Sequence, residues 1–318
     1  MFTIKDEVEK AEKRIRSYVR KTPLEKSFCL SKISKSNVYF KLENMQHTGS
    51  FKARGAFSKL LSLSGTEKNR GIITASSGNH GLGSAYALNR LDINGTIYLP
   101  ENASLQKVSM LKDYNANLKF IGTDCEFTEN SAKETANRNN KIYISPYNDP
   151  QIIGGQGTIA IELKEQIKKI DNIFVSVGGG GLISGISCYL KSINHKIKII
   201  GCLPENSPAM FDAVKSKKIV SSKLLPTLSD GTAGGIEENS ITLAPCISFV
   251  DDWILISEKE IKEAMKLVFV NHRLVIEGSA AVSVASLLRY KEHIKGQNSI
   301  IIICGGNIDM NVFKKIVF

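Results

Sequence analysis

The chain has 318 residues, 42% of them hydrophobic, which is enough for one large domain or two ordinary domains with proper cores. Its 42 Lys and Arg residues outnumber its 31 Asp and Glu residues, so the formal net charge is +11. The two signs alternate along the chain, as in Asp6 to Arg20 and Ser257 to Lys266, whereas nucleic-acid binders gather basic residues into a patch or tail. We therefore predict a lysine-rich, solvated surface and no nucleic-acid partner.

Cysteine spacing and hydropathy exclude further classes. The six cysteines form no CxxC pair and have no histidine at zinc-finger spacing, which argues against structural zinc and a disulfide framework. The longest apolar runs, such as Ile300 to Cys304, are too short to span a bilayer, and Met1 to Lys10 has no apolar signal core. These features predict a cytoplasmic protein with no membrane partner.

The first half of the chain alternates strands and helices. An amphipathic helix is predicted over Phe2 to Arg20, ended by Pro23, and a strand over Val38 to Glu43. Next come predicted strands at 71–75, 95–99 and 117–121 and predicted helices at 80–90, 105–114 and 129–137. Such alternation predicts parallel sheet with crossover helices.

A second series of the same kind follows. Gly154-Gly155-Gln156-Gly157 is expected to precede a helix at 158–168, and Gly178 to Gly181 joins a strand at 173–177 to a helix at 182–192. The remaining predicted elements are a strand at 198–202, mixed turns at 204–241, helices at 258–272 and 279–290, and a strand at 299–303. No linker separates the two series, so we predict an α/β protein of two units that share a cleft.

Lys52 stands where a turn signal gives way to a predicted helix. Gly49 and Ser50 precede it, Ser50 is expected to cap the helix, and Ala53 to Leu61 is rich in helix formers. A lysine on a helix is usually a solvated charge, so a functional role requires further elements of a site for a carbonyl cofactor.

Gly178 to Gly181 supplies one such element. Consecutive glycines between an apolar strand and a helix let backbone N–H groups approach an anion at the positive end of the helix dipole. The spacing does not match the dinucleotide fingerprint, no Walker lysine is present, and Leu203 stands where an acidic ribose ligand belongs. A phosphate cup is the preferred interpretation, and a plain flexible turn is the alternative.

Ser76-Ser77-Gly78-Asn79-His80-Gly81 occupies the same strand-to-helix position and suits a carboxylate. The alternative is an ordinary helix cap formed by Asn79 or Ser77, and His80 alone would more often be structural. Cys304-Gly305-Gly306-Asn307 ends an apolar strand, and its thiol could simply be a small buried group before a turn.

Together these segments resemble the serine/threonine dehydratase and serine racemase family of fold-type II pyridoxal-phosphate enzymes. The resemblance covers nearly the whole chain and rests on motifs in a fixed order: Thr22-Pro23-Leu24, Lys41 to Asn44, Ser50 to Gly55, Ser76 to Gly81, Pro100 to Asn102, Gly154 to Thr158, Gly178 to Gly181 and Cys304 to Asn307. It implies two open, twisted, mostly parallel sheets with flanking helices and the cofactor, pyridoxal 5′-phosphate, in the cleft between domains. The implied large domain is 1–48 and 149–318, and the small domain is 49–148.

The resemblance also implies residue roles. Lys52 would form the internal Schiff base and act as general base, Asn79 would bind the ring hydroxyl, and Ser77 would be the second acid/base. The implied cofactor-binding residues are Phe51, Lys52, Asn79, Gly178, Gly179, Gly180, Gly181, Glu277 and Cys304. The implied substrate-binding residues are Ser76, Ser77, Asn79 and His80. Cys304 would meet the ring nitrogen, which a thiol cannot protonate as a carboxylate does, so β-elimination remains accessible while transamination is disfavoured.

The function implied is a homodimeric, deaminating dehydratase (ammonia-lyase) acting on a small β-hydroxy amino acid such as L-threonine or L-serine. Alternatives are an amino-acid racemase with side elimination, and a dehydratase of hydroxyaspartate or of the hydroxyectoine-breakdown type. A non-catalytic anion- or nucleotide-binding protein is the rival from another class. Leu203 replaces the acid of family members that bind a divalent cation, so no metal is expected.

Two further segments differ from the usual sequence of the family that the chain resembles. The usual Glu-Pro-Ala-Gly stretch reads Glu277-Gly278-Ser279-Ala280, and Ser229 to Gly235 differs from the commonest loop, so the substrate need not be plain threonine. The chain ends about a dozen residues after Asn307, so no regulatory domain and no isoleucine feedback are expected.

Overall fold

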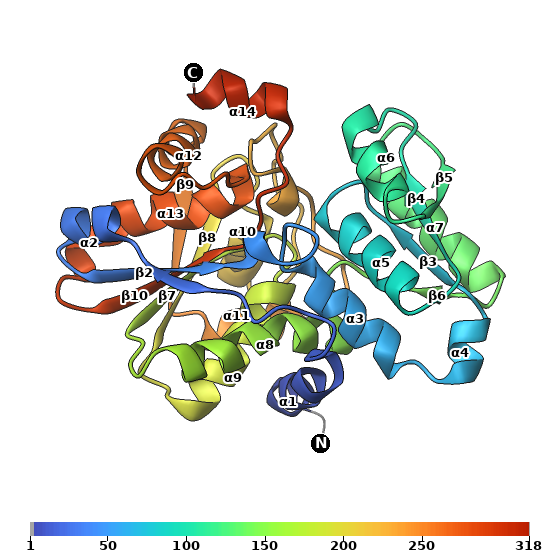
Figure 1. Cartoon of the computed structure of the whole chain (residues 1–318), viewed down its shortest axis with the longest axis horizontal. Coiled ribbons are helices and arrows are strands. Elements are labelled where there is room, and N and C mark those ends of the chain that lie inside the picture. The colour runs from blue at the N-terminus through green and yellow to red at the C-terminus, as the bar shows by residue number, and fades with distance from the viewer. Residues whose placement is uncertain (1–2, 318) are drawn as a thin grey trace.

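Two β-sheets, each flanked by helices, make up the structure, a computed structural model that describes residues 3–317. Figure 1 shows the larger sheet at the left and the smaller one at the right, with α3 between them. This is the α/β architecture that the alternation predicted, so the predicted fold class is confirmed. The predicted N-terminal helix spans Ile4–Ile15 (α1), and Phe2 lies outside the described residues.

The larger sheet has six strands in the order β1-β2-β10-β7-β8-β9. They are β1 (Leu24–Lys26), β2 (Asn37–Leu42), β7 (Asn172–Ser176), β8 (Lys198–Pro204), β9 (Asp252–Ile256) and β10 (Asn298–Ile303). Within residues 3–317, only the pairing of β1 with β2 in this sheet is antiparallel. Among the central strands, Ile301 of β10 faces Phe40 of β2 on one side and Phe174 of β7 on the other. The central strands β10 and β7 are buried on both faces, which explains their continuous apolar runs.

Helices cover both faces of this sheet, as Figure 1 shows. Below it in that view lie α1, α8 (Pro150–Gln166) and α9 (Gly181–Ile193). Above it lie α2 (Phe28–Ser34), α12 (Glu258–His272), α13 (Gly278–Tyr290) and α14 (Met310–Val317). The same unit contains α10 (Ala209–Ser216) and α11 (Leu243–Phe249), and the short 3-10 helices η1 (Glu43–Met45), η2 (Asp230–Thr232) and η3 (Lys291–His293).

The smaller sheet has four parallel strands in the order β5-β4-β3-β6. They are β3 (Ile72–Ala75), β4 (Gly95–Leu99), β5 (Asn117–Phe120) and β6 (Ile142–Tyr143). Its helices are α4 (Gly65–Asn69), α5 (Asn79–Arg90), α6 (Leu105–Lys112) and α7 (Cys125–Arg138). We propose that the two sheets are the cores of the two domains expected from the sequence, 1–48 with 149–318 and 49–148.

Helix α3 (Lys52–Ser62) joins the two units, because it packs on α8 of the larger one and on α5 of the smaller one. Its first turn was expected to be capped by Ser50, and this prediction is wrong. The N-cap position is Phe51, no side chain caps the helix, and the buried Ser50 hydroxyl has no hydrogen-bond partner within residues 3–317.

The segment Gly154 to Gly157 was expected to be a loop before a helix, and it lies inside α8 instead. Its glycines let helices approach closely: a Cβ at Gly155 would lie 2.6 Å from the Arg54 carbonyl oxygen, and one at Gly157 would lie 2.9 Å from the Gly185 carbonyl oxygen. Tertiary packing outweighs the low helix propensity of glycine here. The absence of side chains at Gly155 and Gly157 lets α3 and α9 pack closely against α8.

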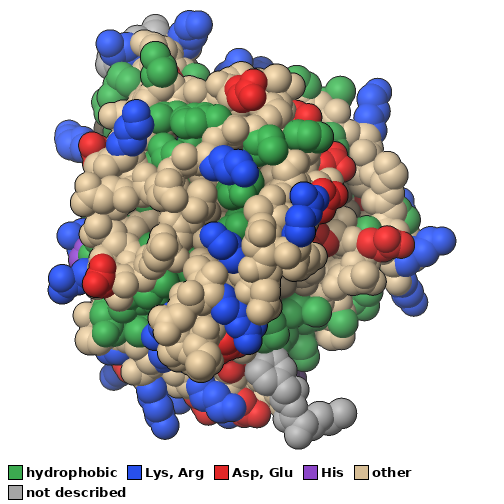
Figure 2. Space-filling view, turned by 90° about the vertical axis from the view of Figure 1, so that its right-hand side faces the viewer, with side chains coloured by type: hydrophobic (Ala, Val, Ile, Leu, Met, Phe, Trp, Pro, Cys, Tyr) green, Lys and Arg blue, Asp and Glu red, His purple; other side chains and the backbone are tan. Residues whose placement is uncertain are grey.

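The surface and the helices bear on two expectations, no nucleic-acid partner and no membrane partner, and both stay predictions. Figure 2 shows one face, on which Lys and Arg side chains are spread among acidic and uncharged ones without a continuous basic area. Over residues 3–317 no helix is both long enough and apolar enough to cross a membrane.

A buried ion network fixes α3 to the larger unit. The fully buried Arg54 guanidinium donates to Glu43 (2.8 Å) and to Glu162 (2.7 Å), and Lys41, also fully buried, pairs with Glu162 as well. Burial raises the pKa of Glu162, but the Arg54 and Lys41 charges outweigh it and hold that pKa at about 2. Each charge is therefore compensated inside the core.

We expect Arg54→Met to lower the free energy of unfolding by about 3–5 kcal/mol, because it leaves Glu43 and Glu162 buried without their main cation. Urea titration followed by circular dichroism measures the loss. Lys21→Met is the matched control, since the Lys21–Glu165 pair is exposed and is expected to contribute about 1 kcal/mol or less. Equal effects of the two changes would contradict the structural role assigned to Arg54.

Candidate active site

A cavity of about 1150 Å³ lies between the two units, and candidate functional segments from both units line it. The loop after β7, the residue after β10 and the start of α3 line it, and Ser76 to His80, which follow β3, line an adjoining cavity. The carboxyl ends of parallel strands are where ligands bind in open α/β sheets. The structure thus brings together the segments that the sequence singled out.

Lys52 is the first residue of α3, and its side chain enters this cavity. Its Nζ donates a hydrogen bond to the Pro146 carbonyl oxygen at 2.8 Å and lies 5.3 Å from the centre of the Phe51 ring. Burial lowers the pKa of Lys52 to about 8, although Cys304, Glu277 and Glu129 act in the opposite direction. A substantial neutral fraction near neutral pH suits a lysine that attacks carbonyls and takes up protons.

Gly178 to Gly181 forms the tight bend between β7 and α9 at the cavity wall. Gly180 has φ +83°, which favours glycine, and a Cβ at Gly179 would lie 2.4 Å from the Tyr147 ring. No side chain caps the N-terminus of α9. The bend therefore leaves the first-turn N–H groups open to an anion, and the close packing explains the glycines better than a plain flexible turn does.

The loop Ser76 to Gly78 leads from β3 into α5 and lines the adjoining cavity of about 410 Å³. The N-cap residue is Gly78, and no side chain caps α5, so the alternative of an ordinary cap by Asn79 or Ser77 is wrong. The Ser76 hydroxyl accepts a hydrogen bond from the Gly78 amide at 3.1 Å. Open amides and two hydroxyls at a helix start suit a carboxylate.

Asn79 is fixed by a hydrogen-bond network on the cavity floor. Its Nδ2 donates to both Glu277 carboxylate oxygens at 2.8 and 3.0 Å, and its Oδ1 accepts from Asn307 Nδ2 at 2.7 Å. Glu277 also accepts from the Asn307 amide. Burial, with the nearby Asp230 charge, raises the pKa of Glu277 to about 7, which the Asn79 and Asn307 hydrogen bonds oppose. The network holds the Asn79 amide in one orientation.

The imidazole of His80 is hydrogen-bonded to other residues of the smaller unit. It is buried and makes hydrogen bonds with Thr74 Oγ1 (2.8 Å) and the Ile144 carbonyl oxygen (3.2 Å). Burial lowers the pKa of His80 to about 3, so the ring is neutral. The substrate-binding role expected for His80 stays a prediction. Because the imidazole is already hydrogen-bonded, the group of His80 that could contact a substrate is its backbone N–H.

Cys304 follows β10 and lines the cavity with a side chain that is 3% exposed. Burial and the Glu277 charge raise the pKa of its thiol, so it is neutral and can donate a weak hydrogen bond. The cavity-lining positions of Cys304, Phe51 and Asn79 agree with the cofactor-binding roles expected for them, which stay predictions.

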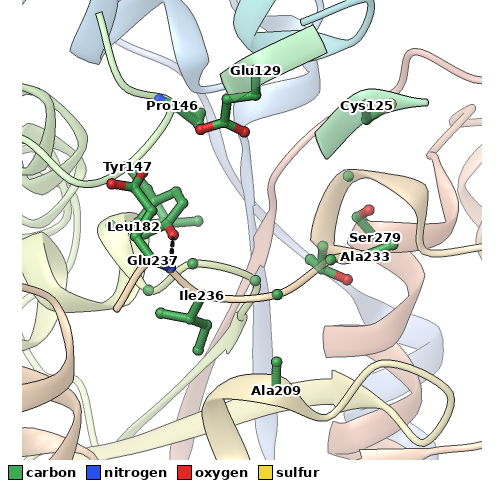
Figure 3. A pocket seen from close by; sticks show the side chains of 18 of the residues that line it. Cys125, Glu129, Pro146, Tyr147, Leu182, Ala209, Ala233, Ile236, Glu237 and Ser279 are labelled. Carbon is green, nitrogen blue, oxygen red and sulfur yellow. Dashed lines mark hydrogen bonds between the residues drawn. The ribbon is translucent and has the colours of Figure 1, made fainter. Parts of the chain in front are cut away.

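Sequence reasoning missed the opposite wall of the cavity. Figure 3 shows Glu129 projecting into it from α7, with Pro146, Tyr147 and Glu237 close by. The Tyr147 hydroxyl accepts a hydrogen bond from the Glu237 backbone amide at 2.8 Å. The period of α7 gave no signal for Glu129, because a glutamate on a charged helix face is usually solvated. Glu237 lies in the 204–241 region, which has no periodic pattern at all.

The expectation about metal stays a prediction. Leu203 lies in β8 and is 1% exposed, packed in the core of the larger unit. Within residues 3–317, no group of three or more His, Cys, Asp and Glu side chains is placed to hold a metal ion.

Comparisons with known proteins identify relatives over the full chain. An L-threonine ammonia-lyase of Thermotoga maritima is 36% identical over 317 residues, covering 100% of this chain and 78% of that protein. The catabolic L-threonine dehydratase of Escherichia coli K12 is 37% identical over 308 residues, covering 96% and 93%. Among solved structures, maize serine racemase has a TM-score of 0.92 at 30% identity, covering 98% of this chain and 95% of that one.

The model of one family, described as pyridoxal-phosphate dependent enzyme, matches residues 15–305, which include Lys52, the Ser76 to Gly78 loop, the Gly178 to Gly181 bend and Cys304. The family expected from the motifs is therefore confirmed, and with it the cofactor. The chain belongs to the pyridoxal-phosphate dependent enzymes.

Proposed function

We propose that this chain is an ammonia-lyase that dehydrates and deaminates a small β-hydroxy amino acid of the threonine or serine type. The observation that carries the proposal is the convergence of Lys52, the Gly178 to Gly181 bend and the Ser76 to Gly78 loop on adjoining cavities. Relatives named threonine ammonia-lyase and threonine dehydratase, at 36% and 37% identity, support it.

The residues present fit pyridoxal phosphate. The Gly178 to Gly181 bend with the uncapped α9 offers neutral N–H donors for the phosphate, and Lys52 offers an amine for the aldehyde. The Asn79 amide, held in place by Glu277 and Asn307, lines the cavity where it would meet the ring hydroxyl, and Cys304 offers a neutral donor to the ring nitrogen. When bound, the cofactor withdraws electrons from the substrate α-carbon, so that the α-proton and then the β-substituent can leave.

The chain's own groups divide the remaining work. The hydroxyls of Ser76 and Ser77, together with the first backbone amides of α5, which no side chain caps, bind and orient the substrate carboxylate. Lys52 would take the α-proton on Nζ as general base, for which its pKa of about 8 is suitable. Elimination releases one water, formed from the β-hydroxyl and a proton, and hydrolysis of the C–N bond consumes one water, so the net conversion of threonine is to 2-oxobutanoate and ammonia.

An amino-acid racemase is the second candidate. The observation that favours it is Ser77, which lines the adjoining cavity and offers a hydroxyl as a second acid/base, together with the likeness to maize serine racemase. We further propose a cytoplasmic homodimer, which rests on the resemblance of the motifs; light scattering on the purified protein tests the dimer.

We expect the purified holoenzyme to form 2-oxo acid and ammonia in equal amounts from L-threonine or L-serine. Lys52→Ala is expected to lower kcat by about 10³-fold or more while the circular dichroism spectrum stays unchanged, because the α-proton loses its base. The exposed Lys164→Ala on α8 is the matched control and should keep normal turnover. Normal turnover in Lys52→Ala, or no product from any β-hydroxy amino acid, would refute the proposal.

Ser77→Ala is expected to reduce any racemisation about 100-fold and elimination less than about tenfold, since only protonation from the second face needs that hydroxyl. Chiral chromatography of recovered serine and a 2-oxo acid assay measure both rates on one preparation. Ser76→Ala serves as the comparison and should affect both reactions alike. An equal loss of both activities in Ser77→Ala would assign Ser77 to substrate binding instead.

A further inference from the structure

The two cavities share a small set of residues, and these surround the place where a substrate would lie between the serine loop and the glycine bend. The shared residues are Lys52, Asn79, Cys125, Glu129, Pro146, Gly231 and Glu277. Three of them, Lys52, Glu129 and Glu277, have basic or acidic side chains. Lys52 belongs to the cofactor, and the Glu277 carboxylate is occupied by Asn79 and Asn307. Glu129 is therefore the charged group left to face the substrate.

Glu129 is held in this position by an ion pair with Lys133, one turn further along α7. Lys133 Nζ lies 2.8 Å from Glu129 Oε1 and 3.4 Å from Glu237 Oε1, so one cation is divided between two carboxylates. Burial acts to lower the pKa of Lys133, but the Glu129 hydrogen bond and the charges of both glutamates raise it above its usual value. Glu237 is also held by Asn148 Nδ2 at 2.9 Å.

The balance of charge around the substrate is negative. In addition to Glu129 and Glu237, the larger cavity is lined by Glu126 and Glu238. Within residues 3–317, the cations lining the two cavities are Lys52, Lys133 and Lys107, and no arginine lines either one. Lys107 is paired with Asp230 at 3.1 Å. No lining cation is thus free to pair a second carboxylate on a substrate.

We propose that Glu129, backed by Glu237 across Lys133, restricts this site to β-hydroxy amino acids whose side chains carry no carboxylate. The inference rests on the proposed function and deepens it, because it selects the threonine and serine type over 3-hydroxyaspartate. A substrate carboxylate in the β-position would enter a partly desolvated cavity opposite a like charge, where repulsion is weakly screened. A neutral β-substituent meets no such cost, and its hydroxyl can donate to a carboxylate oxygen.

Two non-eliminating amino acids test the inference on the holoenzyme. L-2-Aminobutyrate has the skeleton of threonine and L-aspartate that of 3-hydroxyaspartate, but neither has a β-hydroxyl to lose. Their dissociation constants are read from the change in cofactor absorption. We expect L-aspartate to bind about 100-fold more weakly than L-2-aminobutyrate, and Glu129→Gln to narrow that ratio by about tenfold or more, since tenfold corresponds to about 1.4 kcal/mol.

Lys133→Gln provides a test in the opposite direction. Loss of this cation is expected to widen the ratio by about tenfold, because both glutamates then act unneutralised. Glu134→Gln is the matched control. It removes the same charge from α7, but Glu134 is exposed and lines neither cavity. It should leave the ratio unchanged, whereas a purely structural role of Glu129 would predict no opposite effects of Glu129→Gln and Lys133→Gln.

Elimination assays separate this inference from the proposed function. Comparable kcat/KM values for L-threonine and 3-hydroxyaspartate would overturn the role of Glu129 while the ammonia-lyase activity stands. No elimination from either compound would overturn the proposed function itself. If Glu129→Gln does not fold, Lys133→Gln decides alone, and an unchanged binding ratio in that variant overturns the inference.

Discussion

The buried charge cluster of Arg54, Glu43, Glu162 and Lys41 is the interaction on which the geometry of the site depends. Arg54 lies two residues after Lys52 in the first turn of α3, so its fixed guanidinium also fixes where the Lys52 side chain starts. Glu162 keeps a folded pKa of about 2 against the burial that raises it, because Arg54 and Lys41 are so close. Its stabilising effect is therefore full above the unfolded pKa of about 4.5 and is lost as the pH falls toward 2.

A second constraint is the close approach of helices along the glycines of α8. The backbone of Gly155 meets the Arg54 carbonyl, and Gly157 meets Gly185 of α9, the helix whose N-terminus faces the cavity. A side chain at Gly155 would push α3, which carries Lys52, away from α8, and one at Gly157 would push α9, which follows the glycine bend, away from α8. Helix packing, rather than a flexible loop, thus sets the distance between the amine and the expected phosphate site.

Much of the fold and part of the site could be predicted from the sequence. Apolar strands ending in Gly178 to Gly181 and in Cys304, and Lys52 at a helix start, are local signals that survive in the structure. Gly154 to Gly157 misled the prediction because glycine marks both loops and close helix contacts, and only the tertiary structure distinguishes them. The positions of Glu129 and Glu237 in the cavity could not be predicted, because the two residues come from distant segments that meet only after folding.

The central claim is that Lys52 is the residue that carries the cofactor, and one labelling experiment tests it most directly. Cofactor-free protein is mixed with pyridoxal phosphate at a series of pH values, reduced with borohydride, digested and mapped. Because the Lys52 pKa is lowered to about 8, its neutral amine becomes available well below the usual 10.5, so labelling of Lys52 should rise with a midpoint near pH 8. Label found instead on Lys107 or Lys133, the other lysines at the cavities, would contradict the account.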